Sequence, residues 1–276
     1  MEEKIIAIYC LCDDLLKAMN HYEDRQQKMT DAEVMTTALV AMLLFAGNFE
    51  RSRAMLKVSH YIPKMLSTSR YNRRLHCIKE LFLTLFNLLG QTWKQLNSES
   101  IYIIDSFPIA VCDNYRISRA KIYRSEQYRG YIPSKRRYFY GLRIHLMVTK
   151  DCKPVEFFLA PGCLADVDGL KIFNFDLPEG SIVYGDKAYN DYGVEDSLME
   201  SSQIQLLPMR KKNSKRALPD YVAFIQHHYR KMIETAGSMI EKMLPKSIHA
   251  VTAKGFELKV VLFIVAYSIN FCINSL

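Results

Sequence analysis

Cysteine pairs at metal-binding or disulfide-forming spacings are missing from this sequence of 276 residues. Its seven cysteines are odd in number, scattered, and never form a Cys-x-x-Cys pair. This pattern argues against a disulfide framework and against a structural zinc site. We therefore predict reduced thiols in a cytoplasmic protein.

Long uninterrupted apolar runs are missing as well. Two glutamates follow Met1, unlike a secretory leader, and the most apolar stretch, residues 260–273, is interrupted by Ser268 and Asn270. That stretch falls short of the roughly 18 residues that a bilayer span needs. With 49% hydrophobic and 24% charged residues, the composition excludes disorder and collagen-like repeats and indicates a globular protein. We expect a buried helix at 260–273 and no membrane partner.

Acidic residues are scarce in two segments. The whole chain carries a net charge of +8, whereas residues 116–143 hold nine Lys or Arg against Glu126 alone, and residues 210–216 hold five against none. Tyrosines interleave with the first segment, so it could stack on bases and neutralise phosphates, although tyrosines of a loop can also pack on a core. We predict double-stranded DNA as the partner, with contacts from Arg124, Arg129, Lys135, Arg136, Arg137, Arg210, Lys211 and Lys212.

The first 97 residues have a helical pattern. Thr30 and Glu33 form a capping-box signature, and residues 67–69 can cap a second helix whose apolar face runs toward Gly90. Arg70, Arg73 and Arg74 lie at i, i+3 and i+4, as on the recognition helix of a helix-turn-helix motif, although an ordinary solvated face has the same spacing. We predict a helical DNA-binding region at residues 1–97.

Residues 98–276 have a different pattern. Short β-type runs at 101–104, 138–148, 155–159, 182–184 and 204–207 are followed by helical periodicity from Asp220. This order predicts an α/β domain with a mixed sheet flanked by helices.

Three carboxylates in this domain stand out. Asp105 and Asp186 each follow an apolar strand, and Pro108 predicts that the first of these strands ends soon after Asp105. Glu234 borders the apolar face of a helix, one turn after Arg230, which could orient it, hold a phosphate or form an ordinary ion pair. Strand-terminating aspartates are also common without any function. We interpret Asp166 and Asp168 as turn residues and His145 as structural or solvent-facing.

Convergence of the three carboxylates would require a counter-charge. Two carboxylates about 4 Å apart repel by roughly 4 kcal/mol at an effective dielectric of about 20. Hard oxygen ligands with open positions suit Mg²⁺, for which Mn²⁺ can substitute, in phosphoryl transfer.

These acids and their settings resemble a DDE transposase with a ribonuclease H-like fold. More narrowly, residues 69–76 (SRYNRRLH), 104–108 (IDSFP) and 185–189 (GDKAY), with Arg230-x-x-x-Glu234, resemble insertion-sequence family 982 transposases. The resemblance implies that Asp105, Asp186 and Glu234 are catalytic metal ligands. It also implies that Arg230 is the arginine of the family's tyrosine-arginine-glutamate-lysine signature, whose tyrosine and lysine positions hold His227 and Glu241 here.

The function so implied is transposition of an insertion sequence in the bacterial cytoplasm, at the nucleoid. The enzyme would bind the element ends, cleave DNA with Mg²⁺, and join the 3′-hydroxyl to a target, acting as a homodimer on two ends. Two alternatives stay open, namely a ribonuclease H-like nuclease that does not join DNA and a catalytically inactive DNA-binding derivative.

Overall fold

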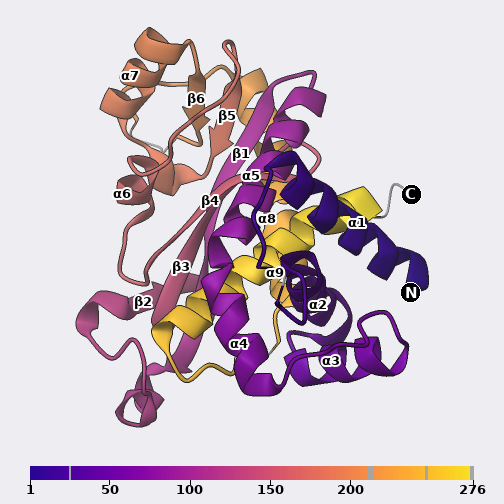
Figure 1. Ribbon diagram of the computed structural model, residues 1–276. Helices are drawn as coiled ribbons and strands as arrows, with labels where there is room; N and C mark the ends of the chain where they lie inside the picture. The colour runs from indigo at the N-terminus through magenta and orange to yellow at the C-terminus, as the bar shows by residue number, and fades with distance from the viewer. Residues whose placement is uncertain (25, 211–213, 246–247, 274–276) are drawn as a thin grey trace. The chain divides into compact units, whose positions relative to one another are not determined.

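A computed structural model describes residues 1–24, 26–210, 214–245 and 248–273, with the backbone alone at 134, 230, 232–234, 236–237, 239 and 243 (Figure 1). The helices are α1 (Glu2–Ala18), α2 (Asp31–Phe45), α3 (Phe49–Val58), α4 (Thr68–Cys77), α5 (Lys79–Leu96), α6 (Asp166–Leu170), α7 (Tyr192–Ser202), α8 (Asp220–Met243) and α9 (Ala253–Ile273). The strands are β1 (Ile101–Asp113), β2 (Arg129–Ile132), β3 (Arg137–Thr149), β4 (Pro154–Pro161), β5 (Ile182–Gly185) and β6 (Gln205–Pro208).

The described residues form two compact units, one made of residues 1–89 and 240–276 and the other of residues 90–239. The first unit contains the amino-terminal helices and also α9, which packs on α2. This grouping of distant segments is not visible in the sequence pattern, where only a change near residue 97 appears. The predicted domain boundary at residue 97 stays a prediction.

Helix α2 begins as its sequence predicts. The Thr30 side chain accepts a hydrogen bond from the Glu33 amide, and the Glu33 carboxylate accepts one from the Thr30 amide, which completes a capping box. The helix is buried around most of its circumference, as expected of a core helix. Helix α9 has the length and apolarity to cross a membrane, yet 67% of its apolar window is buried, so the predicted core helix is confirmed.

The predicted helix from residue 67 toward Gly90 is wrong in two respects. The chain breaks at Ile78 into α4 and α5, and α5 then continues through Gly90 to Leu96. The apolar face is nevertheless correct, since Leu75, Ile78 and Phe82 are buried. Gly90 is not a terminator. A Cβ atom on Gly90 would lie 2.8 Å from the Val155 carbonyl oxygen, so the glycine permits close approach of α5 to β4.

We expect Gly90→Ala to lower the free energy of unfolding by about 1–3 kcal/mol, because α5 and the β4 backbone at Val155 must separate to admit the methyl group. Helix propensity alone would give the opposite sign, a gain of up to about 1 kcal/mol. Urea denaturation measures the difference. Gly193→Ala in α7 is the matched control, because its Cβ would meet only Asp191 Oδ1 at 3.4 Å. Equal or greater stability of Gly90→Ala would contradict the packing argument.

The sheet surrounds β1. Its order is β2-β3-β1-β5-β6, with β4 also paired to β3. Strands β1, β3 and β4 are antiparallel neighbours, whereas β5 and β6 run parallel to β1 (Figure 1). A central first strand between an antiparallel meander and two parallel strands is the ribonuclease H-like arrangement. The predicted mixed sheet flanked by helices, preceded by amino-terminal helices, is confirmed.

The predicted end of β1 near Pro108 is wrong. The strand continues to Asp113, and Pro108 pairs with Arg143 of β3. The reason is that β5 pairs only with residues 101–104 of β1, so beyond them one edge of β1 has no β5 partner. A proline is tolerated at such an edge because its missing N–H removes no ladder bond there. Asp105 therefore lies within a long strand, at the point where the parallel strands stop.

Candidate active site

Strand register indicates that two of the predicted acids lie close together. Ile104 of β1 pairs with Gly185 at the end of β5. Asp105 and Asp186 directly follow this pair, so we expect them to lie side by side, since neighbouring strands are about 4.8 Å apart. Both side chains are half-buried. Asp186 accepts a hydrogen bond from the Ala188 amide, and Asp105 accepts one from the Ser106 amide at 2.7 Å.

Helix α8 packs on the face of the sheet that carries this pair. Side chains alternate along strands, so Asp105 shares a face with Ile103, and Asp186 shares it with Tyr184. Tyr229 of α8 stacks on Tyr184, with ring centroids 4.9 Å apart. Position 234 follows Tyr229 by five residues, a rise of about 7.5 Å along the helix. The backbone at 230 and 234 is helical, whereas the side chains of Arg230 and Glu234 lie outside the described residues.

A polar network occupies the opposite face of β1. Ser106 donates a hydrogen bond of 2.5 Å to Asp166, and the Arg143 guanidinium donates to Ser106 at 2.9 Å and to Asp166 at 3.3 Å. The interpretation of Asp166 as a turn residue is therefore wrong, because it begins α6 and binds two side chains of the sheet. Asp168 belongs to the same short helix and is exposed.

Tyr189 lies close to this network. Its side chain is fully buried, and burial, followed by the charges of Asp166 and Asp105, raises the pKa of its hydroxyl well above the usual range. The hydroxyl stays protonated at neutral pH. The sequence pattern gives no indication of this residue, because the groups that surround its hydroxyl come from separate segments of the chain.

His145 is structural, as predicted. It pairs across the sheet with Ser106, is fully buried, and stacks on Phe158 with ring centroids 4.6 Å apart. Burial lowers the pKa of its imidazole to about 4, while nearby Asp166 raises it and Arg143 lowers it further. The folded protein consequently holds a neutral histidine.

We expect His145 to make the fold less stable in acid. Its pKa is lower in the folded chain than in the unfolded chain, so the unfolded chain binds more protons between pH 6.5 and about 4. Stability from this group is intact above pH 6.5 and is lost as the pH falls, by at most about 1.4 kcal/mol per pH unit. Urea titrations of wild type and His145→Phe should diverge in this window. Parallel curves would contradict the assignment.

The basic segment at 116–143 is largely exposed. Arg124, Lys135, Arg136 and Arg137 are on the surface, and Arg129 is half-buried. The hairpin of β2 and β3 carries the exposed, mutually packed rings of Tyr131 and Tyr138, with the Arg129 guanidinium 4.4 Å from the Tyr138 centroid. The exposure of this basic segment is consistent with its predicted role in DNA contact.

Two of the other predicted DNA contacts have intramolecular partners. Arg74 lies 2.7 Å from the buried carboxylate of Asp31, whereas Arg70 and Arg73 beside it are exposed. Arg210 forms a two-pronged ion pair with buried Glu195 at 2.6 and 2.7 Å. Lys211 and Lys212 lie outside the described residues.

A separate group of possible metal ligands appears in the first unit. Among the described residues, His21, Glu23 and Asp31 place their ligand atoms within 4.8 Å of one another. His21 lies 2.8 Å from Asp31, whose other oxygen binds Arg74. The charge of Asp31 is thus already balanced by side chains, which favours an ion-pair network over a metal site. No local sequence motif indicates this network.

The fold and the acid pair define a ribonuclease H-like protein with carboxylates at the end of its parallel strands. A family model described as "Transposase DDE domain" matches residues 95–249, more than half of the chain. The chain therefore belongs to this transposase DDE-domain family, and its class is that of enzymes that transfer phosphoryl groups on DNA.

Two further comparisons accompany this match. A search of curated proteins gives no match. Among solved structures, the chain is similar to one described as "Crystal structure of a pre-cleavage Mos1 transpososome", with 12% identity, 92% of this chain and 81% of that chain covered, and a TM-score of 0.26.

Proposed function

We propose that this protein is the transposase of an insertion sequence of the family 982 type. It would bind the element ends, cleave their phosphodiester bonds, and join the freed 3′-hydroxyl to target DNA. The observation that carries the proposal is the register that sets Asp105 beside Asp186 under α8, in a chain of the DDE-domain family.

The residues present fit a divalent cation. Asp105 and Asp186 offer hard oxygen donors from adjacent strands, and Glu234 would complete the set from α8, as the family resemblance implies. Bound Mg²⁺ or Mn²⁺ would supply Lewis-acid stabilisation of the phosphate and of the departing 3′-oxygen. The protein's own part is to fix the carboxylates on a rigid sheet. Arg230 would orient Glu234 or hold a phosphate.

Exposed cations would hold the DNA backbone. We expect the double variant Lys135→Gln/Arg136→Gln to reduce the slope of log affinity against log salt by about 1.8, because each lost phosphate contact removes about 0.9. Fluorescence anisotropy with a duplex at several salt concentrations measures this slope. Lys171→Gln/Lys254→Gln, at two exposed positions outside both basic segments, is the control. An unchanged slope in the first variant would exclude this surface as a phosphate contact.

A strand-transfer assay tests the proposed reaction. Sequencing of protein-bound fragments from DNA that flanks the gene would identify the ends, and those ends would then be incubated with plasmid, protein and Mg²⁺. Joined products, formed with Mg²⁺ or Mn²⁺ and absent with EDTA, support transposition. Cleavage without joining would indicate the nuclease alternative, and binding without cleavage the inactive one. Light scattering of the protein bound to paired ends tests the proposed homodimer. We place this activity in the bacterial cytoplasm.

A further inference from the structure

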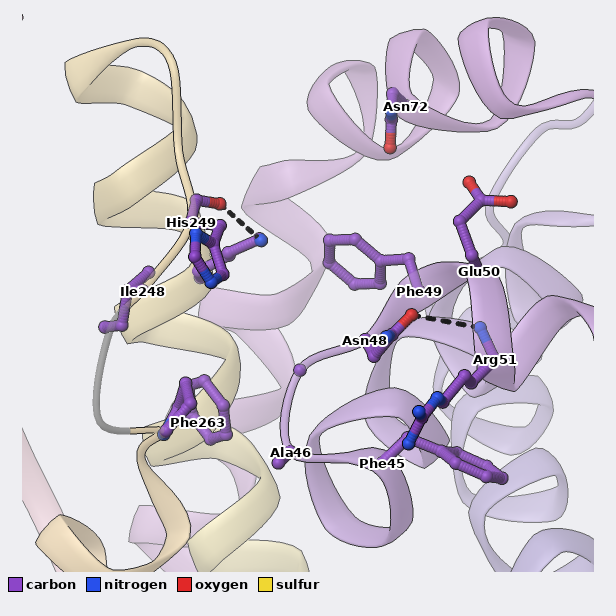
Figure 2. Close-up of a pocket in the computed structure, with 13 residues that line it drawn as sticks. Phe45, Ala46, Asn48, Phe49, Glu50, Arg51, Asn72, Ile248, His249 and Phe263 are labelled. Atoms are coloured by element: carbon purple, nitrogen blue, oxygen red, sulfur yellow. Dashed lines mark hydrogen bonds between the residues drawn. The ribbon is translucent and has the colours of Figure 1, made fainter.

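The helical unit contains a cavity remote in sequence from the acid pair. It has a volume of about 640 Å³, within the range of small-molecule sites. Its lining comes from residues 45–51, from Asn72 of α4, and from Pro245, Ile248, His249, Lys259 and Phe263 (Figure 2). All belong to the same compact unit.

Lys259 brings positive charge into this cavity. Lys259 donates a hydrogen bond of 2.6 Å to the His249 carbonyl and lies 5.3 Å from the centroid of the Phe49 ring. No ion pair among the described residues includes Lys259. Lys259 is half-buried, and this burial lowers the pKa of its ammonium group. An anionic ligand would supply the missing countercharge.

The acid of the lining does not offset this charge. Both oxygens of Glu50 accept from the Arg53 guanidinium at 2.8 Å. Figure 2 shows Phe49 directed toward His249 and Glu50 directed away from it. The cavity also faces the start of α3, where the Asn48 side chain caps the Arg51 amide and the helix dipole favours negative charge.

The lining is aromatic as well as cationic. Phe45 and Phe49 are half-buried, and Phe263, which also lines the cavity, is fully buried. Gly47 makes this possible, since its φ of +79° suits glycine and a Cβ there would come within 2.9 Å of the Phe263 ring. Asn48 and Asn72 add amide groups that can recognise polar edges. Such a site fits a flat polar ring joined to an anion.

We propose that this cavity binds a single nucleotide, with its phosphate on Lys259 and its base against the aromatic lining. The inference rests on the proposed DNA function, because Asn72 lies on α4 between the exposed Arg70 and Arg73. DNA held by those arginines would bring an unstacked nucleotide to the opening. A free nucleotide has the same chemistry and is the other source.

Calorimetric titration of the full chain with dAMP tests the site. We expect dAMP to bind with one-to-one stoichiometry, at least tenfold more tightly than inorganic phosphate. Lys259→Met, which keeps the chain length without the charge, should weaken dAMP at least tenfold. Lys254→Met, at an exposed position outside the lining, should change it less than twofold. Absence of dAMP binding, equal binding of phosphate, or an unaffected Lys259→Met variant with a native melting curve would overturn the proposal.

A fluorescent duplex distinguishes the two sources. The probe is a duplex in which 2-aminopurine is mispaired, since mismatched bases leave the stack most easily. Its fluorescence should increase on protein binding if a nucleotide of DNA enters the cavity. Brightening should be absent with Lys259→Met. If dAMP binds and the duplex stays dark, the ligand is a free nucleotide. Failure of the transposase proposal would appear separately, as absent metal-dependent cleavage by a protein that still binds dAMP.

Discussion

Replacing Asp105 by asparagine is expected to lower metal-dependent DNA cleavage by about 10³-fold or more. The substitution keeps the size of the side chain and removes one negative oxygen from the pair formed with Asp186 across β1 and β5. Loss of several kcal/mol of metal-based stabilisation corresponds to roughly three powers of ten in rate. Initial rates of cleavage of an end-bearing plasmid with Mg²⁺ and with Mn²⁺ measure the effect.

The fold should survive this change, because removal of one charge relieves repulsion within the acid pair. Asp105→Asn should therefore melt at the wild-type temperature or above it. Asp151→Asn, at an exposed turn between β3 and β4, is the matched control and should retain full activity. Anomalous scattering from crystals soaked in Mn²⁺ would locate the ions directly. Full cleavage by Asp105→Asn, or ions bound elsewhere, would refute the assignment.

Arg210→Met is expected to lower the free energy of unfolding by about 3 kcal/mol, because it strands a buried carboxylate. The side chains of Arg210 and Glu195 are only 11% and 7% exposed, and Arg216 at 3.7 Å is too distant to replace the two short hydrogen bonds. Urea denaturation and the melting temperature measure the loss. Lys215→Met, at the neighbouring exposed cation, should have almost no effect.

A double variant separates structure from DNA contact. Arg210→Met/Glu195→Met removes both charges, so it should recover much of the stability lost in the single variant. If Arg210 instead contacts DNA, the single variant should bind DNA more weakly even at temperatures well below its melting temperature. The double variant should not restore that affinity. Wild-type stability of Arg210→Met would show that the buried pair contributes nothing to the fold.

Local sequence patterns were sufficient to predict the sheet. Apolar runs marked β1, β3, β4, β5 and β6, because buried strands read as continuous hydrophobic segments. Strand β2 was missed because its four residues, Arg129–Ile132, lie within a basic, tyrosine-rich stretch. The end of β1 was misplaced because Pro108 breaks a strand only where both edges are paired, and pairing is a property of the sheet.

Partners of charged side chains could not be predicted in the same way. Arg74 lies 43 residues from Asp31, and Arg210 lies 15 residues from Glu195. A cation that neutralises a buried acid has the same sequence signature as one that faces DNA, so only tertiary burial separates the two. The cavity beside Lys259 is likewise assembled from three segments, and no local motif indicates it.

The overhang of β1 beyond β5 sets a length scale. Asp113 follows Asp105 by eight residues on a strand that stays paired with β3 throughout, apart from an irregularity between Ala110 and Cys112. At about 3.3 Å per residue, this ladder spans roughly 26 Å, comparable to about eight base pairs at 3.4 Å each. Under the proposed function, this arm would set the distance between the scissile phosphate at Asp105 and any DNA contact at the far end, where Arg137 pairs with Asp113 at 3.0 Å.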